Sequence, residues 1–177
     1  MGLAARTTAV EATRALAAAV AELARPGDVI LLAGELGAGK TAFAQGFGRG
    51  LGVPGPITSP TFTLARQYVG RLVLHHLDVY RLEHMEEVYD VGLPELLDEG
   101  GVTLIEWGDA VVPVLPADFL EIRLTFGDGD DDRDLTLRPV GGPWSARRRA
   151  LAAALAPWID EDEGVIGGAP SSKGAPC

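Results

Sequence analysis

The segment GELGAGKT, Gly34 to Thr41, has the residue types and the spacing of a loop that holds a nucleotide phosphate. It fits the Walker A pattern, in which two glycines separated by four residues are followed by Lys and then Ser or Thr. The glycines let the backbone curl so that its N–H groups point at the β-phosphate, and the following helix adds the positive end of its dipole. We expect Lys40 to neutralise phosphate charge and the Thr41 hydroxyl to bind Mg²⁺.

The context of this segment supports the same interpretation. It follows the apolar run 29–34, which is typical of a buried parallel strand, and it precedes a helix predicted from about Thr41 to Leu51. The chain has 13 Arg but only two Lys, and the one outside the C-terminal tail is Lys40. We therefore expect the nucleotide to be bound by Gly37, Ala38, Gly39, Lys40, Thr41 and Ala42.

A loop of this kind needs a carboxylate across the sheet to hold the magnesium ion, directly or through water. Glu106 ends the apolar strand predicted at 102–107, and Asp78 ends the strand LVLHHLD, so both are candidates. In each case the alternative is a charged residue that merely reaches solvent. His75 and His76 lack the partners of a metal site, and we expect them on the two faces of one strand.

The nucleotide and the reaction are partly constrained by what the sequence lacks. Guanine-specific switches of this class recognise their base with an Asn-Lys-x-Asp segment, but this chain contains no asparagine. ATP is therefore favoured over GTP. A small-molecule kinase stays open as an alternative, although no arginine-rich segment is found that would close over a transferring phosphoryl group.

The remaining patterns predict an α/β fold. We expect it to be P-loop NTPase-like, with a mixed, mainly parallel sheet flanked by helices and phosphate chemistry at the carboxyl ends of the strands. Two hairpins make the sheet mixed, and an acidic turn, GDGDDD, joins the second. The predicted strands of the hairpins are 61–69 with 71–79 and 118–126 with 133–140, and the other predicted helices are 8–24, 83–90, 93–98 and 144–158.

Length and composition favour a single domain over residues 1–158, which would be the P-loop ATPase domain. We expect residues 159–177, which are rich in acidic, Gly, Pro and Ser residues, to form a disordered tail. The lone cysteine, Cys177, excludes an internal disulfide, and neither a secretory signal nor a membrane span is expected, so we predict a cytoplasmic protein. The formal charge of −10 argues against extensive direct contact with nucleic acid. The basic cluster 147–149 is expected on the solvated face of the last helix.

Taken in their order along the chain, the motifs resemble those of the bacterial TsaE family. Members of this family are small ATPases that assist threonylcarbamoylation of adenosine in transfer RNA. The resemblance covers roughly residues 8–156. Walker A is common to many families, but the other motifs at these spacings form a narrower signature. The matching segments are GELGAGKT (34–41), TSPTFTL (58–64), HHLDVYRL (75–82), GLPELL (92–97) and LIEW (104–107).

The resemblance implies a role for each matching residue. Thr41 and Glu106 would be the magnesium ligands, and Lys40 the phosphate contact. The segment 59–61 would be a switch that responds to the γ-phosphate, with Thr61 as its sensor. Asp78 would organise the attacking water or the outer shell of the metal.

Two further positions are implied by the resemblance alone. Trp107 would lie beside the nucleotide where partner proteins are sensed, with core packing as the alternative, and Arg133 matches an arginine that reaches the nucleotide. Since the acidic turn before Arg133 would repel bound ATP, we expect this turn to point away.

The family also implies partners. These are TsaD, which transfers the threonylcarbamoyl group to the adenosine beside the anticodon, and TsaB. The chain would be a partner-stimulated ATPase that resets this pair between turnovers, and would not itself be the transferase. Self-association is left open. The rival classes are a small-molecule kinase and a nucleotide-dependent binding protein that does not hydrolyse its ligand.

Overall fold

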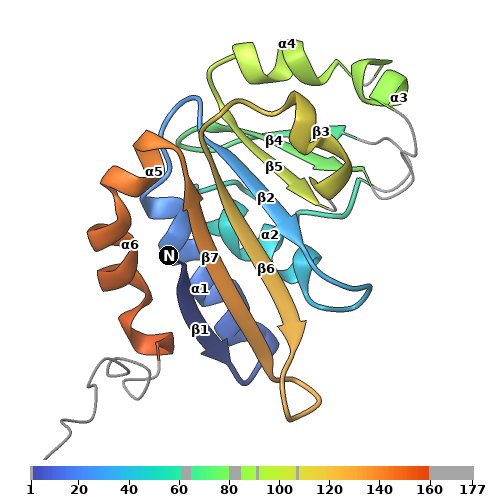
Figure 1. Ribbon diagram of the computed structural model, residues 1–177. Helices are drawn as coiled ribbons and strands as arrows, with labels where there is room; N and C mark the ends of the chain where they lie inside the picture. Colours follow the sequence, from blue (N-terminus) through green and yellow to red (C-terminus); the bar gives the residue numbers. More distant parts are fainter. Residues whose placement is uncertain (1, 61–64, 80–84, 91, 107, 160–177) are drawn as a thin grey trace, which may run out of the picture.

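The computed structural model of this chain describes residues 2–60, 65–79, 85–90, 92–106 and 108–159. Within these residues, seven strands form one sheet in the order β1-β7-β6-β2-β5-β4-β3 (Figure 1). The neighbours β6, β2, β5 and β4 run parallel, and the outer pairings are antiparallel. The strands are β1 (Leu3–Thr7), β2 (Val29–Ala33), β3 (Ala65–Val69), β4 (Val73–Asp78), β5 (Val102–Glu106), β6 (Phe119–Phe126) and β7 (Arg133–Val140).

Helices cover both faces of the sheet, which confirms the predicted α/β class. One face packs against α1 (Val10–Glu22), α2 (Lys40–Gly50) and α6 (Arg148–Leu155) in the larger core. The other face packs against α4 (Leu93–Asp98) and the 3₁₀ helix η1 (Gly108–Val114), and α3 (Met85–Asp90) adjoins these two. The short elements α5 (Gly142–Ala146) and η2 (Ala156–Trp158) flank α6.

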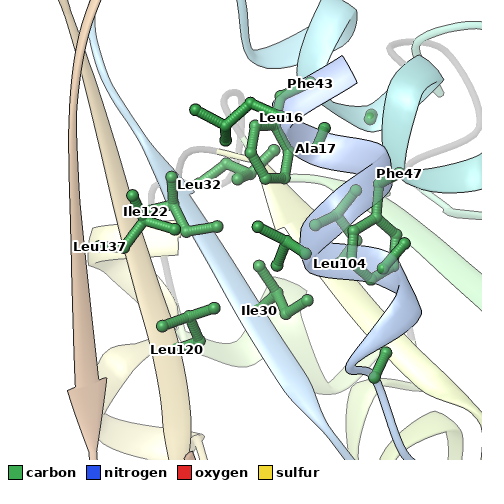
Figure 2. Packing of buried hydrophobic residues seen from close by; sticks show 14 of the residues in the cluster. Leu16, Ala17, Ile30, Leu32, Phe43, Phe47, Leu104, Leu120, Ile122 and Leu137 are labelled. Carbon is green, nitrogen blue, oxygen red and sulfur yellow. The ribbon is translucent and has the colours of Figure 1, made fainter. Parts of the chain in front are cut away.

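The larger core fixes how α2 sits on the sheet. Figure 2 shows Phe43 and Phe47 of α2 and Leu16 of α1 directed toward Ile30 and Leu32 of β2. Because β2 lies in the middle of the sheet, all five of its residues are buried, and its alternate side chains belong to the cores on opposite faces. The start of α2 is thereby held beside the carboxyl end of β2.

Strand register brings the ends of three strands to one edge. Leu32 of β2 and Asp78 of β4 are both register partners of Glu106, the last residue of β5. Since these pairings are parallel, the segments that follow the three strands leave the sheet at the same edge. Any chemistry carried by the loop after β2 is therefore adjacent to Asp78 and Glu106.

Two elements differ from the sequence prediction. The structure adds β1, which pairs antiparallel with β7 from Leu3↔Leu137 to Thr7↔Arg133. The helix predicted over 144–158 is divided into α5, α6 and η2, with Arg147 between the first two.

Arg147 is also a correction to the predicted solvated basic cluster, because it is buried while Arg148 and Arg149 are exposed. Its Nη1 and Nη2 donate to the two carboxylate oxygens of Asp28 at 2.7 and 2.6 Å, and Nη1 also donates to the carbonyl of Leu23. The guanidinium lies 3.9 Å from the ring centroid of Trp144. This pair ties the C-terminal helices to the turn that leads into β2.

In the described part of the chain, no helix combines the length and apolarity that crossing a membrane requires. Ile159 packs against the larger core. Residues 160–177 of the predicted tail lie outside the described residues, so the domain division stays a prediction.

We predict that Arg147→Ala lowers the free energy of unfolding by about 3–5 kcal/mol, because it leaves the Asp28 carboxylate buried without its countercharge. Urea unfolding followed by circular dichroism measures this. Arg148→Ala is the matched control. Because Arg148 is exposed, this substitution should change the free energy of unfolding by less than about 0.5 kcal/mol. Equal effects of the two substitutions would contradict a stabilising role of the pair.

Candidate functional site

The loop between β2 and α2 is shaped by glycines in backbone conformations that other residues rarely adopt. Gly34 has φ +148°, and a Cβ there would lie 2.5 Å from the carbonyl oxygen of Leu124 in β6. Gly39, with φ +105°, is the N-cap residue of α2. The first N–H groups of a helix have no partner inside it, so the loop ends at donors that suit an anion.

Lys40 extends back across this loop. It is 5% exposed, and its Nζ donates hydrogen bonds of 2.8 Å to the carbonyl oxygens of Gly34 and Glu35. Burial lowers the pKa of Lys40, while the negative charges of Glu106 and Asp78 oppose that shift. An ammonium group held by exchangeable carbonyl contacts beside a curled loop can bind phosphate oxygens without a large rearrangement.

Asp78 and Glu106 face the loop from the ends of β4 and β5. They are register partners on adjacent parallel strands, and they are 6% and 2% exposed. The alternative that either carboxylate merely reaches solvent is therefore wrong. The Ser59 hydroxyl donates to Asp78 Oδ2 at 3.2 Å, and His76 Nε2 lies 2.8 Å from Glu106 Oε1. Both carboxylates are held in place by neighbouring side chains.

The carboxylate oxygens of Asp78 and Glu106 fit a magnesium ion whose other ligands would come from a phosphate. Thr41, the residue after Lys40, is half-buried in the first turn of α2. Among the described residues, no cluster of three or more His, Cys, Asp or Glu side chains could enclose a metal. Mg²⁺ is usually bound by one or two protein oxygens together with phosphates and water. Thr41 and Glu106 stay the predicted ligands.

Arg133, the first residue of β7, packs against the outer side of the loop. Its Nε donates to the carbonyl of Ala38 at 3.1 Å and its Nη2 to that of Gly37 at 3.4 Å. Its Nη1 binds the carbonyls of Asp130 and Asp132 in the acidic turn. The structure thus places Arg133 beside the loop between β2 and α2, and its contact with a nucleotide stays a prediction.

The acidic turn has a counterion that the sequence analysis missed. Arg6 of β1 donates to Asp128 at 2.9 Å and to Asp132 at 3.0 Å, and these contacts raise the pKa of the Arg6 guanidinium. Since β1 was not predicted, this pairing could not be foreseen. Two carboxylates of the turn therefore share the single positive charge of Arg6.

The other predicted site residues are placed as follows. Ala38 is buried, Ala42 is half-buried and Gly37 is exposed at the loop. Thr61 and Trp107 lie outside the described residues, so their roles stay predictions. His75 and His76 lie on opposite faces of β4, as expected.

The sequence of this chain is similar to those of known proteins. The family model of the threonylcarbamoyl adenosine biosynthesis protein TsaE matches residues 7–135. The tRNA threonylcarbamoyladenosine biosynthesis protein TsaE of Bacillus subtilis is 45% identical over 137 residues, covering 77% of this chain and 85% of the relative. The protein of the same name from Streptomyces coelicolor is 40% identical over 139 residues, covering 75% and 93%.

A solved structure is similar as well. The crystal structure of Bacillus subtilis YdiB superposes with a TM-score of 0.73 at 39% sequence identity. The match covers 86% of this chain and 95% of that one.

We predict that Arg133→Ala loosens the phosphate loop, because the loop carbonyls of Gly37 and Ala38 lose their guanidinium donor. Backbone amides of residues 34–40 should exchange hydrogen about tenfold faster, the effect of losing about 1.4 kcal/mol of charged hydrogen bonding. Mass spectrometry of hydrogen exchange measures the change. Arg138→Ala, on the same strand but paired with Glu121, is the control and should leave the loop unaltered. Unchanged exchange in Arg133→Ala would show that the contact does not hold the loop.

Proposed function

Because this chain belongs to the TsaE family of threonylcarbamoyl adenosine biosynthesis proteins, we propose that it is the Mg-ATP-hydrolysing subunit of that pathway. It acts in tRNA threonylcarbamoyladenosine biosynthesis, the role that its relatives' name gives. ATP binding, ATP hydrolysis and the action on TsaB and TsaD are the proposed parts. A cytoplasmic location belongs to the same proposal.

One observation carries the proposal: a glycine-shaped loop with a buried lysine faces two buried carboxylates across the ends of parallel strands. Lys40 supplies positive charge to the phosphates by exchanging its contacts with the carbonyls of Gly34 and Glu35. Glu106 and Thr41 would supply oxygen ligands to a magnesium ion, which would neutralise phosphate charge when bound. The absence of asparagine favours ATP over GTP.

Hydrolysis requires a water molecule aligned with the γ-phosphorus. The water oxygen would attack the phosphorus, the bond from phosphorus to the bridging oxygen would break, and ADP would leave with that electron pair. The released phosphate would keep the protons of the water, or lose one to solvent. Asp78 is the residue proposed to orient this water, and its Oδ2 is already engaged by Ser59 of the predicted switch segment. A γ-phosphate that draws the switch segment toward itself would release that oxygen for the water.

A partner completes the catalytic arrangement in this proposal. Arg133 is engaged by the backbone carbonyls of Gly37, Ala38, Asp130 and Asp132, so it is not poised to project over a transferring phosphoryl group. Positive charge supplied by another protein accelerates such reactions strongly. We therefore assign a low basal rate that rises with the TsaB–TsaD pair, and the net charge of −10 leaves the transfer RNA to those partners.

We predict that wild-type protein releases phosphate from Mg-ATP slowly by itself and faster with purified TsaB and TsaD. Lys40→Ala and Glu106→Ala should each reduce the stimulated rate by about a hundredfold or more, because the first removes positive charge at the phosphates and the second removes a proposed magnesium ligand. Glu95→Ala, an exposed carboxylate on α4, is the control and should retain the rate. Full activity in either site variant would refute the site assignment.

The same assay separates the rival functions. A small-molecule kinase would consume ATP in proportion to an added acceptor and without other proteins. A non-hydrolysing binder would hold Mg-ATP without turnover under any of these conditions. A rate indifferent to the TsaB–TsaD pair would remove the proposed coupling while leaving the phosphate site in place.

A further inference from the structure

The described core holds a buried contact between His76 and Glu106, and no role has been assigned to His76 in the proposed function. The His76 side chain is 0% exposed, and its Nε2 lies 2.8 Å from Glu106 Oε1. His76 is the register partner of Leu104 on β5, two residues before Glu106. Side chains two apart on a strand share a face, so His76, Asp78 and Glu106 lie together on the face that packs against α2.

The surroundings of the ring determine where its proton sits. His76 Nδ1 is buried and has no hydrogen-bond partner among the described residues. A neutral imidazole carries one N–H. With the proton on Nδ1, a buried N–H donor would have no acceptor, and the Nε2 lone pair would face a carboxylate oxygen. With the proton on Nε2, the ring donates to Glu106, and only an acceptor is left without a partner.

We propose that His76 is the positioning residue for Glu106: its Nε2–H holds Oε1, which leaves Oε2 available to the magnesium ion of Mg-ATP. This rests on the proposed Mg-ATP function. A carboxylate with one oxygen held by a hydrogen bond is restricted in its orientation, and its other oxygen stays available as a metal ligand. Loss of such a supporting hydrogen bond typically costs 10–100-fold in metal affinity.

His75 provides a matched control. It is the neighbour in sequence and is also buried, with burial lowering its pKa, but it faces the opposite side of the sheet. Its Nε2 lies 3.4 Å from Glu99, at the far end of β4 from the phosphate loop. Loss of either histidine removes a ring of the same size from the same strand, and only His76 contacts Glu106.

The test compares His76→Leu, His76→Gln and His75→Leu by nucleotide binding over a range of Mg²⁺ concentrations and again in EDTA. His76→Leu should raise the Mg²⁺ concentration for half-maximal ATP binding by 10–100-fold and leave the affinity in EDTA within about twofold. His76→Gln, whose amide N–H reaches close to the position of Nε2, should restore the Mg²⁺ dependence to within about threefold. His75→Leu should match the wild type in both measurements.

Three results would overturn the proposal. One is a His76→Leu variant with wild-type Mg²⁺ dependence, and another is a His76→Gln variant as defective as His76→Leu. The third comes from nitrogen NMR of the histidine rings in the nucleotide-free chain, assigned with His76→Gln, if the His76 proton lies on Nδ1. Because that spectrum needs no ligand, it tests the hydrogen bond even where the wild type binds no Mg-ATP, a result that would overturn the proposed function instead.

Discussion

The parallel pairing of β2, β5 and β4 is the constraint on which the candidate site depends. It brings Leu32, Asp78 and Glu106 to the same level at one edge of the sheet, although they are far apart in sequence. The loop after β2 leaves that edge and enters α2, which the larger core holds against the same face (Figure 2). A change of one residue in register would turn Asp78 and Glu106 to the opposite face, away from Lys40.

Burial makes the charges at this edge depend on one another. Lys40, Asp78 and Glu106 are each less than a tenth exposed, and a buried charge is costly unless hydrogen bonds or opposite charges compensate it. The structure supplies part of this compensation through Ser59, His76 and the loop carbonyls. Two neighbouring carboxylates and one ammonium leave an excess of one negative charge, which would favour a cation bound beside them. This excess agrees with the proposal that Glu106 binds a magnesium ion.

Local sequence patterns predicted most of the fold and the placement of Glu106. The strands at 29–33, 73–78 and 102–106 and the start of α2 follow from apolar runs, glycines and the spacing of the loop. What could not be predicted depends on contacts between distant segments. The strand β1 has no clear alternation and exists through pairing with β7, and Arg147 is buried because Asp28, 119 positions away, receives it. The histidine that holds Glu106 was predicted only as a strand residue, since its partner lies on another strand.

Titration calorimetry of the purified chain with ATP tests most directly the claim that this sheet edge is a Mg-ATP site. The titration is made in Mg²⁺, repeated in EDTA, and repeated with GTP in Mg²⁺. We expect one ATP bound per chain, an affinity that increases with Mg²⁺, and weaker binding of GTP. A folded protein that binds no ATP in Mg²⁺, or binds it equally in EDTA, would show that this edge of the sheet is not a Mg-ATP site.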